Sequence, residues 1–256
     1  MTMLLLGAGP SSPSSSPIPT SGLRLWFGGK LAQCYRDNPP TVPCALTDYV
    51  GFEASLGVGL PNAINGNPLS DGPYPPDEGG PTIQSDGLSC ANVGPFNVWE
   101  GLAGAVDVPL TGDFTAYAAG TLASGDKFLP FGTGYLKSSA AVILKHNDNN
   151  LYFSTDPTGN FVLRAFGTLA GLVLIRVRRA SSLVYFTWTG VAEDAGQARS
   201  GTATISASGA ELTNNIFSSP SSRYLSRILY DRNIVPGSAE DLQIRAYILS
   251  VDGASL

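Results

Sequence analysis

The chain has 256 residues, of which 14% are charged, and its 15 basic and 20 acidic residues give a formal net charge of −5. A chain of this length can bury a substantial core and can form a β-sandwich as one domain. A net negative charge argues against general nucleic-acid binding, which needs clustered Lys and Arg to neutralise phosphates. The 30 Gly and 19 Pro residues predict a chain that is rich in turns.

Residues 1–22 form a Ser- and Pro-rich segment that starts with Met-Thr-Met-Leu-Leu-Leu-Gly-Ala-Gly. This composition cannot form a core by itself and therefore predicts an extended arm. Leu4, Leu5 and Leu6 are its expected anchor on a partner protein, and packing along its own domain is the alternative. The apolar run is too short for a signal peptide or a membrane span.

The first strand is predicted at 23–27 and the second at 47–54. A Pro- and Gly-rich loop at 56–86 follows, which either carries function or covers a sheet edge. From residue 87 onward, short apolar stretches and turns recur about every 8–12 residues, which is typical of a sandwich or barrel. These stretches predict further strands at 88–93, 105–108, 113–122, 140–146, 151–155, 161–167, 202–206 and 224–230.

The clearest strand pattern lies at 169–190, where two strands are predicted with a turn at 180–182. In both strands apolar, mostly β-branched or aromatic, residues occupy every second position, which is the pattern of strands with one face on a core. The residues predicted to face this core are Val173, Ile175, Val177, Val184, Phe186 and Trp188. Trp26, on the first predicted strand, is expected to be buried in the same way.

The C-terminal segment predicts one helix over 239–250, which ends near Gly253. Ser238 is the expected N-cap, Asp241 follows three residues later, and acidic residues occupy the first turn. The apolar stripe expected to pack on the sandwich consists of Leu242, Ala246, Ile248 and Leu249.

Four motifs resemble those of the concanavalin A-like, or laminin G-like, jelly-roll sandwich in the variety found in bacteriophage virion proteins. They are Gly-Leu-x-Leu-Trp at 22–26, Phe-Thr-x-Tyr at 114–117, an Arg-rich strand followed by Val-Tyr-Phe at 176–186, and Leu-Tyr-Asp-Arg at 229–232 before a capped helix. The resemblance implies an all-β, concanavalin A-like β-sandwich at 23–256 with one C-terminal helix and an extended N-terminal arm at 1–22. The Leu-Leu-Leu-Gly-Ala-Gly run resembles the start of phage tail and head accessory proteins.

The sequence lacks the residue patterns of common hydrolytic mechanisms. Sandwich glycosidases carry carboxylates at alternate positions of one strand, as Glu-x-Asp-x-Glu, and this string is absent. His146 is the only histidine, and neither Gly-x-Ser-x-Gly nor a phosphate-binding Gly-rich loop is present. We therefore expect that the protein has no catalytic residues and is not an enzyme.

Glycan binding is a chemistry that the residues leave open. Trp99 lies in a Gly- and Pro-rich region and is the candidate for stacking on a sugar, with core packing as the alternative. Arg164, Arg176 and Arg178 belong to a basic strip that would contact an anionic glycan or an acidic partner, or would form a solvated outer face.

Metal and disulfide chemistry have little support in the sequence. Calcium is the one ion considered, with 147–150 and Asp231 as candidate oxygen ligands, although a hairpin turn explains the Asn-rich segment without a metal. No cofactor and no other metal is expected. The three cysteines favour free thiols, with a Cys34–Cys44 bridge as the alternative.

Together these features predict a non-enzymatic bacteriophage virion protein that is associated with the tail or fibre or decorates the capsid. Its arm would bind capsid, portal or tail proteins, and its sandwich would be displayed outward, where it could bind a host-surface glycan. The expected location is the virion, assembled in the bacterial host cytoplasm. A soluble, lectin-like carbohydrate-binding module or adhesin is the alternative. A homotrimer is left open, and neither nucleic acid nor a membrane is an expected partner.

Overall fold

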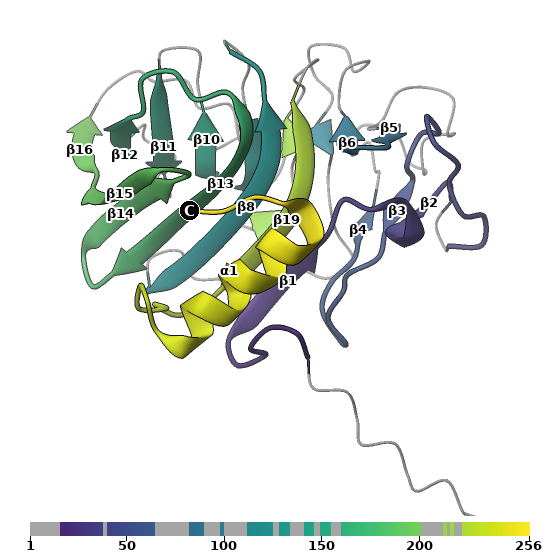
Figure 1. Ribbon diagram of the computed structural model, residues 1–256, viewed down its shortest axis with the longest axis horizontal. Helices are drawn as coiled ribbons and strands as arrows, with labels where there is room; N and C mark the ends of the chain where they lie inside the picture. The colour runs from purple at the N-terminus through teal and green to yellow at the C-terminus, as the bar shows by residue number, and fades with distance from the viewer. Residues whose placement is uncertain are drawn as a thin grey trace, which may run out of the picture.

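The computed structural model describes residues 16–37, 40–64, 82–89, 98–99, 112–124, 128–133, 141–145, 149–154, 160–200, 212–213, 216–217 and 222–256. These residues form two large antiparallel β-sheets that pack face to face, two smaller sheets and a C-terminal helix (Figure 1). The prediction of an all-β sandwich of the jelly-roll type with one C-terminal helix is confirmed.

The larger sheet has the strand order β15-β14-β13-β8-β19-β6-β5, and β1 also pairs with β19. Its strands are β1 (Leu23–Phe27), β5 (Thr82–Gln84), β6 (Gly87–Ser89), β8 (Phe114–Leu122), β13 (Gly171–Ala180), β14 (Leu183–Trp188), β15 (Val191–Ala195) and β19 (Arg223–Tyr230). β8 pairs with β19 along one edge of that strand. Because β1 pairs with residues 227–230 and β6 with residues 223–224, these two strands follow each other along the other edge.

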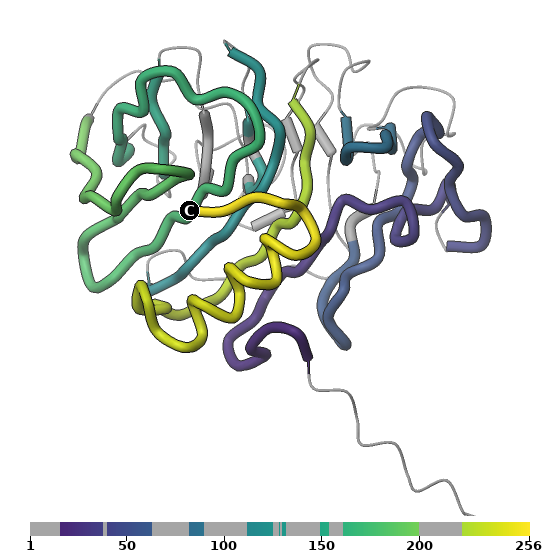
Figure 2. The backbone as a smooth tube through the Cα atoms, viewed as in Figure 1, coloured from purple at the N-terminus to yellow at the C-terminus, as the bar shows by residue number. Residues whose placement is uncertain are grey.

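The second large sheet has the order β16-β12-β11-β10-β9-β17. Its strands are β9 (Phe128–Thr133), β10 (Ala141–Lys145), β11 (Asn150–Ser154), β12 (Asn160–Ala165), β16 (Gln197–Ser200) and β17 (Leu212–Thr213). The smaller sheets contain β2 (Cys34–Tyr35), β3 (Phe52–Glu53) and β4 (Ala63–Ile64), and β7 (Val98–Trp99) with β18 (Ile216–Phe217). A short 3-10 helix, η1 (Leu31–Gln33), precedes β2. Figure 2 shows the segment from β2 to β4 beside β1, at one end of the sandwich.

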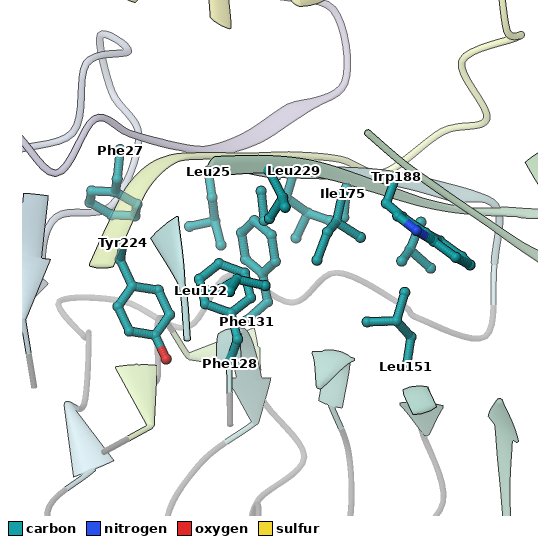
Figure 3. Packing of buried hydrophobic residues seen from close by; sticks show 14 of the residues in the cluster. Leu25, Phe27, Leu122, Phe128, Phe131, Leu151, Ile175, Trp188, Tyr224 and Leu229 are labelled. Carbon is teal, nitrogen blue, oxygen red and sulfur yellow. The ribbon is translucent and has the colours of Figure 1, made fainter. Parts of the chain in front are cut away.

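The main core lies between the two large sheets. In β13 and β14 every second residue faces it, as expected of strands. All six residues predicted to face the core in β13 and β14 belong to it, and the predicted turn is observed at residues 181–182. Trp26 and Trp188 are both buried, as predicted. Figure 3 shows side chains of the two sheets meeting in this layer, among them Leu25, Ile175, Trp188 and Leu229 from one sheet and Phe128, Phe131 and Leu151 from the other.

The helix α1 (Ala239–Asp252) lies across the outer face of the larger sheet (Figure 1). Its predicted caps are confirmed: the Ser238 hydroxyl accepts a hydrogen bond from the Asp241 N–H, and Gly253 ends the helix in the left-handed conformation, with φ of 73°. Ile244 and Ile248 pack into a second apolar cluster on this face, which includes Trp26, Tyr117, Leu174 and Ile228.

The predicted apolar stripe of the helix is confirmed for Ile248 and wrong for its other three residues. Leu242, Ala246 and Leu249 are exposed, and the buried face runs through Asp241, Ile244 and Ile248. The cause is Asp241, which forms an ion pair with Arg176 of β13 and so turns its own side of the helix toward the sheet. An apolar pattern places acidic residues such as Asp241 toward solvent, and it therefore selects a face of the helix next to the one that is buried.

The described part of the predicted arm, 16–22, lies against the sandwich. Ile18 is buried in the cluster below α1, the Tyr230 hydroxyl donates to the Pro19 carbonyl at 2.8 Å, and Arg232 Nε donates to the Ser21 carbonyl at 2.9 Å. Leu4, Leu5 and Leu6 lie outside the described residues, so their role as an anchor stays a prediction.

Several predicted strands differ from those observed. The strands that were not predicted are β2, β7, β9, β15, β16, β17 and β18. The stretch 47–54 contains only β3, and β4 and β5 lie within the predicted loop at 56–86. The stretches 105–108 and 202–206 lie outside the described residues. β15 and β16 have polar, charged sequences at the sheet edges, which do not show the apolar alternation of a central strand.

Candidate functional site

A cleft of about 490 Å³ opens beside β19, in the interval between the end of β1 and the start of β6. Its volume falls in the range of about 300–1,000 Å³ that is usual for small-molecule sites. Its lining combines polar and apolar residues from seven parts of the chain: Gly29, Lys30, Leu31, Leu46, Gln84, Ser85, Asp86, Gly87, Thr121, Leu172, Leu225, Val251 and Asp252.

A β-bulge in β19 forms one side of this cleft. Tyr224 pairs with Gly120 and Arg227 pairs with Ala118, so three steps along β19 correspond to two along β8. Such a bulge bends the strand and redirects its side chains, and bulges occur often beside functional sites. Leu225, within the bulge, lines the cleft.

Two glycines permit the close approach of chains that makes the cleft. Gly29 has φ of 61° and Gly87 has φ of 127°, both in the region that favours glycine. A Cβ atom added to either residue would overlap the carbonyl oxygen of Tyr224. The end of β1 and the start of β6 therefore both reach the backbone of β19 at the bulge.

The register of the sheet places further cleft residues in one row. Leu172 of β13 pairs with Thr121 of β8, and Thr121 pairs in turn with Arg223 of β19. Directly paired residues lie on the same face of a sheet. Arg223 Nε donates to Asp86 Oδ1 at 3.1 Å, so the turn between β5 and β6 is held next to this row.

Lys30 and Asp252 join the end of β1 to the end of α1. Lys30 Nζ lies 2.8 Å from Asp252 Oδ1 and donates to the Val251 carbonyl at 3.1 Å, while the Ser226 N–H donates to Asp252 Oδ2 at 3.0 Å. Figure 2 shows the C-terminal end of the helix next to the chain that follows β1. The Asp252 side chain is fully buried, so both of its oxygens serve to fix this wall of the cleft.

A buried ion pair supports the wall from behind. Arg227, which follows the bulge, donates from Nη2 to Glu53 Oε2, and both side chains are fully buried. The Gly29 N–H donates to Glu53 Oε1 at 2.9 Å. Glu53 therefore connects the bulged strand to the glycine at the mouth of the cleft.

Asp86 is the exposed carboxylate of the cleft, with 60% of its side chain accessible. Among the residues that the structure describes, only Arg223 contacts this carboxylate, through one of its two oxygens. Partly exposed leucines, Leu31, Leu46 and Leu172, supply apolar walls. An apolar cleft with a few directed polar groups is the usual form of a small-molecule site.

Two of the predicted glycan contacts, Arg176 and Arg178, do not face solvent. Arg176 is 4% exposed and donates from Nη1 to Asp241 at 2.6 Å and from Nη2 to Glu193 at 3.1 Å. Arg178 donates from Nη2 to Glu193 at 2.6 Å, and its guanidinium lies 4.1 Å from the centre of the Tyr185 ring. Both guanidinium groups are thus used to hold α1 and β15 on the sheet.

The charges in this network are fixed by its contacts. Burial alone would raise the pKa of Asp241, but hydrogen bonds from the Gly237 N–H, Arg176 and Tyr117 outweigh it and hold that pKa below its ordinary value. Burial, and then the charge of Asp241, raise the pKa of the Tyr117 hydroxyl. Burial acts to lower the pKa of Arg176, but the hydrogen bond and charge of Asp241 outweigh it and raise that pKa. Asp241 stays ionised and its partners stay protonated at neutral pH, as expected of a structural network.

The remaining predicted contacts are not brought together with these two. Arg164 lies on β12 of the other large sheet, where its Nη2 is 3.1 Å from Asp194 Oδ2. The predicted basic strip therefore divides between two sheets. Trp99 lies on β7 opposite Ile216, and its role in stacking on a sugar stays a prediction.

The described part of the chain contains no group of three or more His, Cys, Asp and Glu side chains that could hold a metal ion. Asp231, a candidate calcium ligand, instead accepts a hydrogen bond from Arg24 Nε at 2.6 Å. Asn147 and Asp148 lie outside the described residues. None of the described helices has the length and apolar character needed to cross a bilayer.

The sequence did not reveal the cleft, because its lining comes from segments that are far apart in the chain. Two local signals were present, the Gly28-Gly29 and Asp86-Gly87 pairs, which mark sharp changes of chain direction. Neither pair indicates the strand beside which it will lie.

No known protein family matches the sequence, and no curated protein matches it. Two solved structures of Trypanosoma rangeli sialidase are similar to this chain, one in complex with 2,3-difluoro-KDN and one with 2,3-difluorosialic acid. Each is 14% identical, covers 94% of this chain and 36% of the sialidase chain, and has a TM-score of 0.51. The botulinum neurotoxin serotype C1 binding domain covers 53% of this chain and 37% of its own at 8% identity, with a TM-score of 0.36, which is too low to support an argument.

The similarity to the sialidases establishes the class of the fold, a β-sandwich, and nothing finer. The chain spans about a third of the length of the sialidase chains. The expectation that the protein is not an enzyme is overturned by this finding, since the proteins that share the fold are enzymes. At this identity the similarity does not assign their reaction to this chain. Neither sialidase structure supports the bacteriophage assignment.

Proposed function

We propose that this chain is a carbohydrate-binding β-sandwich module that binds a glycan in the cleft beside the β19 bulge. The observation that carries the proposal is the lining of the cleft, which includes Asp86, whose side chain is 60% exposed, and several partly exposed leucines. A sugar ring presents hydroxyl groups at its edge and C–H groups on its faces. A charged acceptor beside an apolar wall matches both.

The fold supports the same proposal in a coarser way. The sialidase structures that share the sandwich are complexes with sialic-acid analogues. A module of this fold is therefore found in chains that act on sugars. Because fold alone does not fix function, the cleft is the stronger support.

The proposal is tested by screening the full chain on a glycan array and by measuring saturation-transfer NMR with each sugar that binds. Leu172→Ala removes an apolar wall and should weaken binding by about tenfold, since a buried apolar side chain contributes about 1.5–3 kcal/mol. Leu183→Ala is the matched control, because Leu183 is 51% exposed, Leu172 is 43% exposed, and Leu183 does not line the cleft. Absence of any bound glycan, or equal loss in both variants, would refute the proposal.

Attachment to a bacteriophage virion through the arm at 1–22 is the second candidate function. Residues 16–22 are held on the sandwich by hydrogen bonds from Tyr230 and Arg232, so the preceding residues start from a fixed position. We propose that Leu4, Leu5 and Leu6 bind a capsid, portal or tail protein of the particle. This use is compatible with glycan binding by the displayed sandwich.

The deletion that tests attachment must spare the buried Ile18. Deletion of residues 1–15 should abolish incorporation into particles while the sandwich stays folded, as judged by its thermal unfolding. Serine at positions 4, 5 and 6 together should do the same. Normal incorporation of both variants would exclude the arm as the attachment site.

A further inference from the structure

We infer that the cleft selects a neutral pyranose and discriminates against sialic acid and other sugars that carry a carboxylate. This inference rests on the proposed glycan-binding function and names the class of ligand for the same cleft. It differs from what the sialidase complexes alone would suggest, since their ligands are acidic sugars. The inference depends on how the charges of the cleft are already paired.

The lysine of the cleft is already paired, and 38% of its side chain is exposed. Lys30 Nζ is held at 2.8 Å from Asp252 Oδ1 and at 3.1 Å from the Val251 carbonyl oxygen. The Asp252 side chain is fully buried, so this partner is not displaced by rotation into solvent. An acidic sugar that approached Lys30 would have to compete with Asp252 for its charge.

The arginine beside the cleft is also engaged. Arg223 donates through Nε to Asp86 at 3.1 Å and through Nη1 to the Ser89 hydroxyl at 3.1 Å and the Ser222 carbonyl at 3.2 Å. Arg176 and Arg178, the basic residues nearest in sequence to the wall residue Leu172, are bound to Asp241 and Glu193. Among the described residues, each of these cations therefore has a carboxylate partner.

The most exposed of the paired charges at the cleft is a carboxylate. Asp86 is 60% exposed, and Arg223 contacts only one of its two oxygens among the residues described. A carboxylate can accept hydrogen bonds from two adjacent sugar hydroxyls, and such charge-assisted bonds are stronger than neutral ones. A carboxylate on the ligand would instead meet Asp86 in a partly enclosed space, where repulsion is screened less than in water.

The leucine walls agree with a pyranose as the occupant. Leu31, Leu46 and Leu172 are partly exposed and line the cleft together with Val251. These side chains offer contact to the C–H face of a ring and no further charge. A neutral hexose satisfies the acceptor at Asp86 and covers the leucines without disturbing either ion pair.

The experiment compares methyl glycosides of glucose, galactose and mannose with N-acetylneuraminic acid, using saturation-transfer NMR and calorimetry on the full chain at low ionic strength. At least one neutral glycoside should bind at least about tenfold more tightly than N-acetylneuraminic acid. Asp86→Asn should weaken the neutral sugar about tenfold and should reduce the discrimination against the acid, because the repelling charge is gone.

Asp194→Asn is the matched control. Asp194 is 62% exposed and lies 3.1 Å from an arginine nitrogen, nearly as Asp86 does, but it is on β15 and does not line the cleft. This variant should bind both sugars as the unmodified protein does. The thermal unfolding of both variants shows whether the exposed carboxylates contribute to folding.

The outcomes separate the inference from the function on which it rests. If N-acetylneuraminic acid binds as tightly as the neutral sugars, or more tightly, the module is a glycan binder but the inference is wrong. If the neutral sugar binds and Asp86→Asn has no more effect than Asp194→Asn, the assignment of Asp86 is wrong. If no sugar binds, both the inference and the proposed function fail.

Discussion

The buried pair Arg227–Glu53 should be the most sensitive polar contact in the sandwich. Both side chains are fully buried, and Glu53 also accepts the Gly29 N–H at 2.9 Å. Glu53→Gln retains an oxygen for Gly29 but removes the negative charge that Glu53 places against the guanidinium of Arg227. Breaking one side of a buried ion pair costs about 3–5 kcal/mol. Since domains are stable by about 5–15 kcal/mol, this cost is about a fifth or more of the total free energy of unfolding.

Urea unfolding followed by circular dichroism measures this cost. With an m-value near 3 kcal/mol/M, the midpoint for Glu53→Gln should fall by about 1 M or more. Asp194→Asn serves as the control, because exposed ion pairs contribute about 0–1 kcal/mol. Its partner Arg164 is 32% exposed, compared with complete burial of Arg227.

A double variant shows whether the cost comes from the buried charge that Arg227 retains. Glu53→Gln combined with Arg227→Met removes both charges and keeps an acceptor for the Gly29 N–H. Replacing a buried pair by apolar or neutral groups is often neutral or stabilising, so the double variant should recover at least half of the loss. The reasoning would be refuted by a cost below about 1 kcal/mol for Glu53→Gln, or by losses that simply add.

Three other regions give separate predictions. The pKa of Asp241 is lowered in the folded chain, so the ionised side chain stabilises the fold fully above the ordinary pKa of 3.8. This stabilisation is lost as the pH falls from there toward the folded pKa. Urea midpoints measured from pH 7 to pH 2 should therefore fall less for Asp241→Asn than for the unmodified protein. Burial raises the pKa of Cys44 to about 11 and also raises that of Cys34, so Ellman's reagent at pH 8 should modify both thiols only after unfolding in urea. Ile248→Ala should lower stability by about 2–5 kcal/mol in the same unfolding assay, and Leu249→Ala, at an exposed position of the same helix, by less than about 1 kcal/mol; equal effects would contradict the observed rotation of the helix.

Local patterns predicted the elements whose signals are contained within a few neighbouring residues. Alternation in 169–190 identified both strands and their core faces, because side-chain direction in a strand has a period of two. The caps of α1 were predicted from Ser238 and Gly253, since capping depends on residues within one turn. The face of the helix was not, because the partner that buries Asp241 is Arg176, 65 residues away in sequence.

The candidate site was not predicted for the same reason, since its contacts join residues that are far apart in the sequence. Arg176 and Arg178 were correctly placed on the outer face of their strand, but only the three-dimensional arrangement brings α1 and Glu193 of β15 over that face. The cleft depends on a one-residue bulge in β19, and pairing register between distant strands is not written in any single segment. Sequence reasoning therefore located charged side chains without showing which of them had partners.

The residues that line the cleft are different from the residues that specify the sandwich fold. The sandwich is shared with part of the sialidase chains, at 14% identity, yet the cleft residues lie where strands end and where β19 bulges. Changes in such positions alter a site while the core alternation that specifies the sandwich is kept. In this chain Glu53 and Arg227 serve both the fold and the cleft, because their buried ion pair stabilises the sandwich and Glu53 holds Gly29 at the mouth of the cleft. The stability of the fold and the shape of the cleft are thus coupled through one buried ion pair.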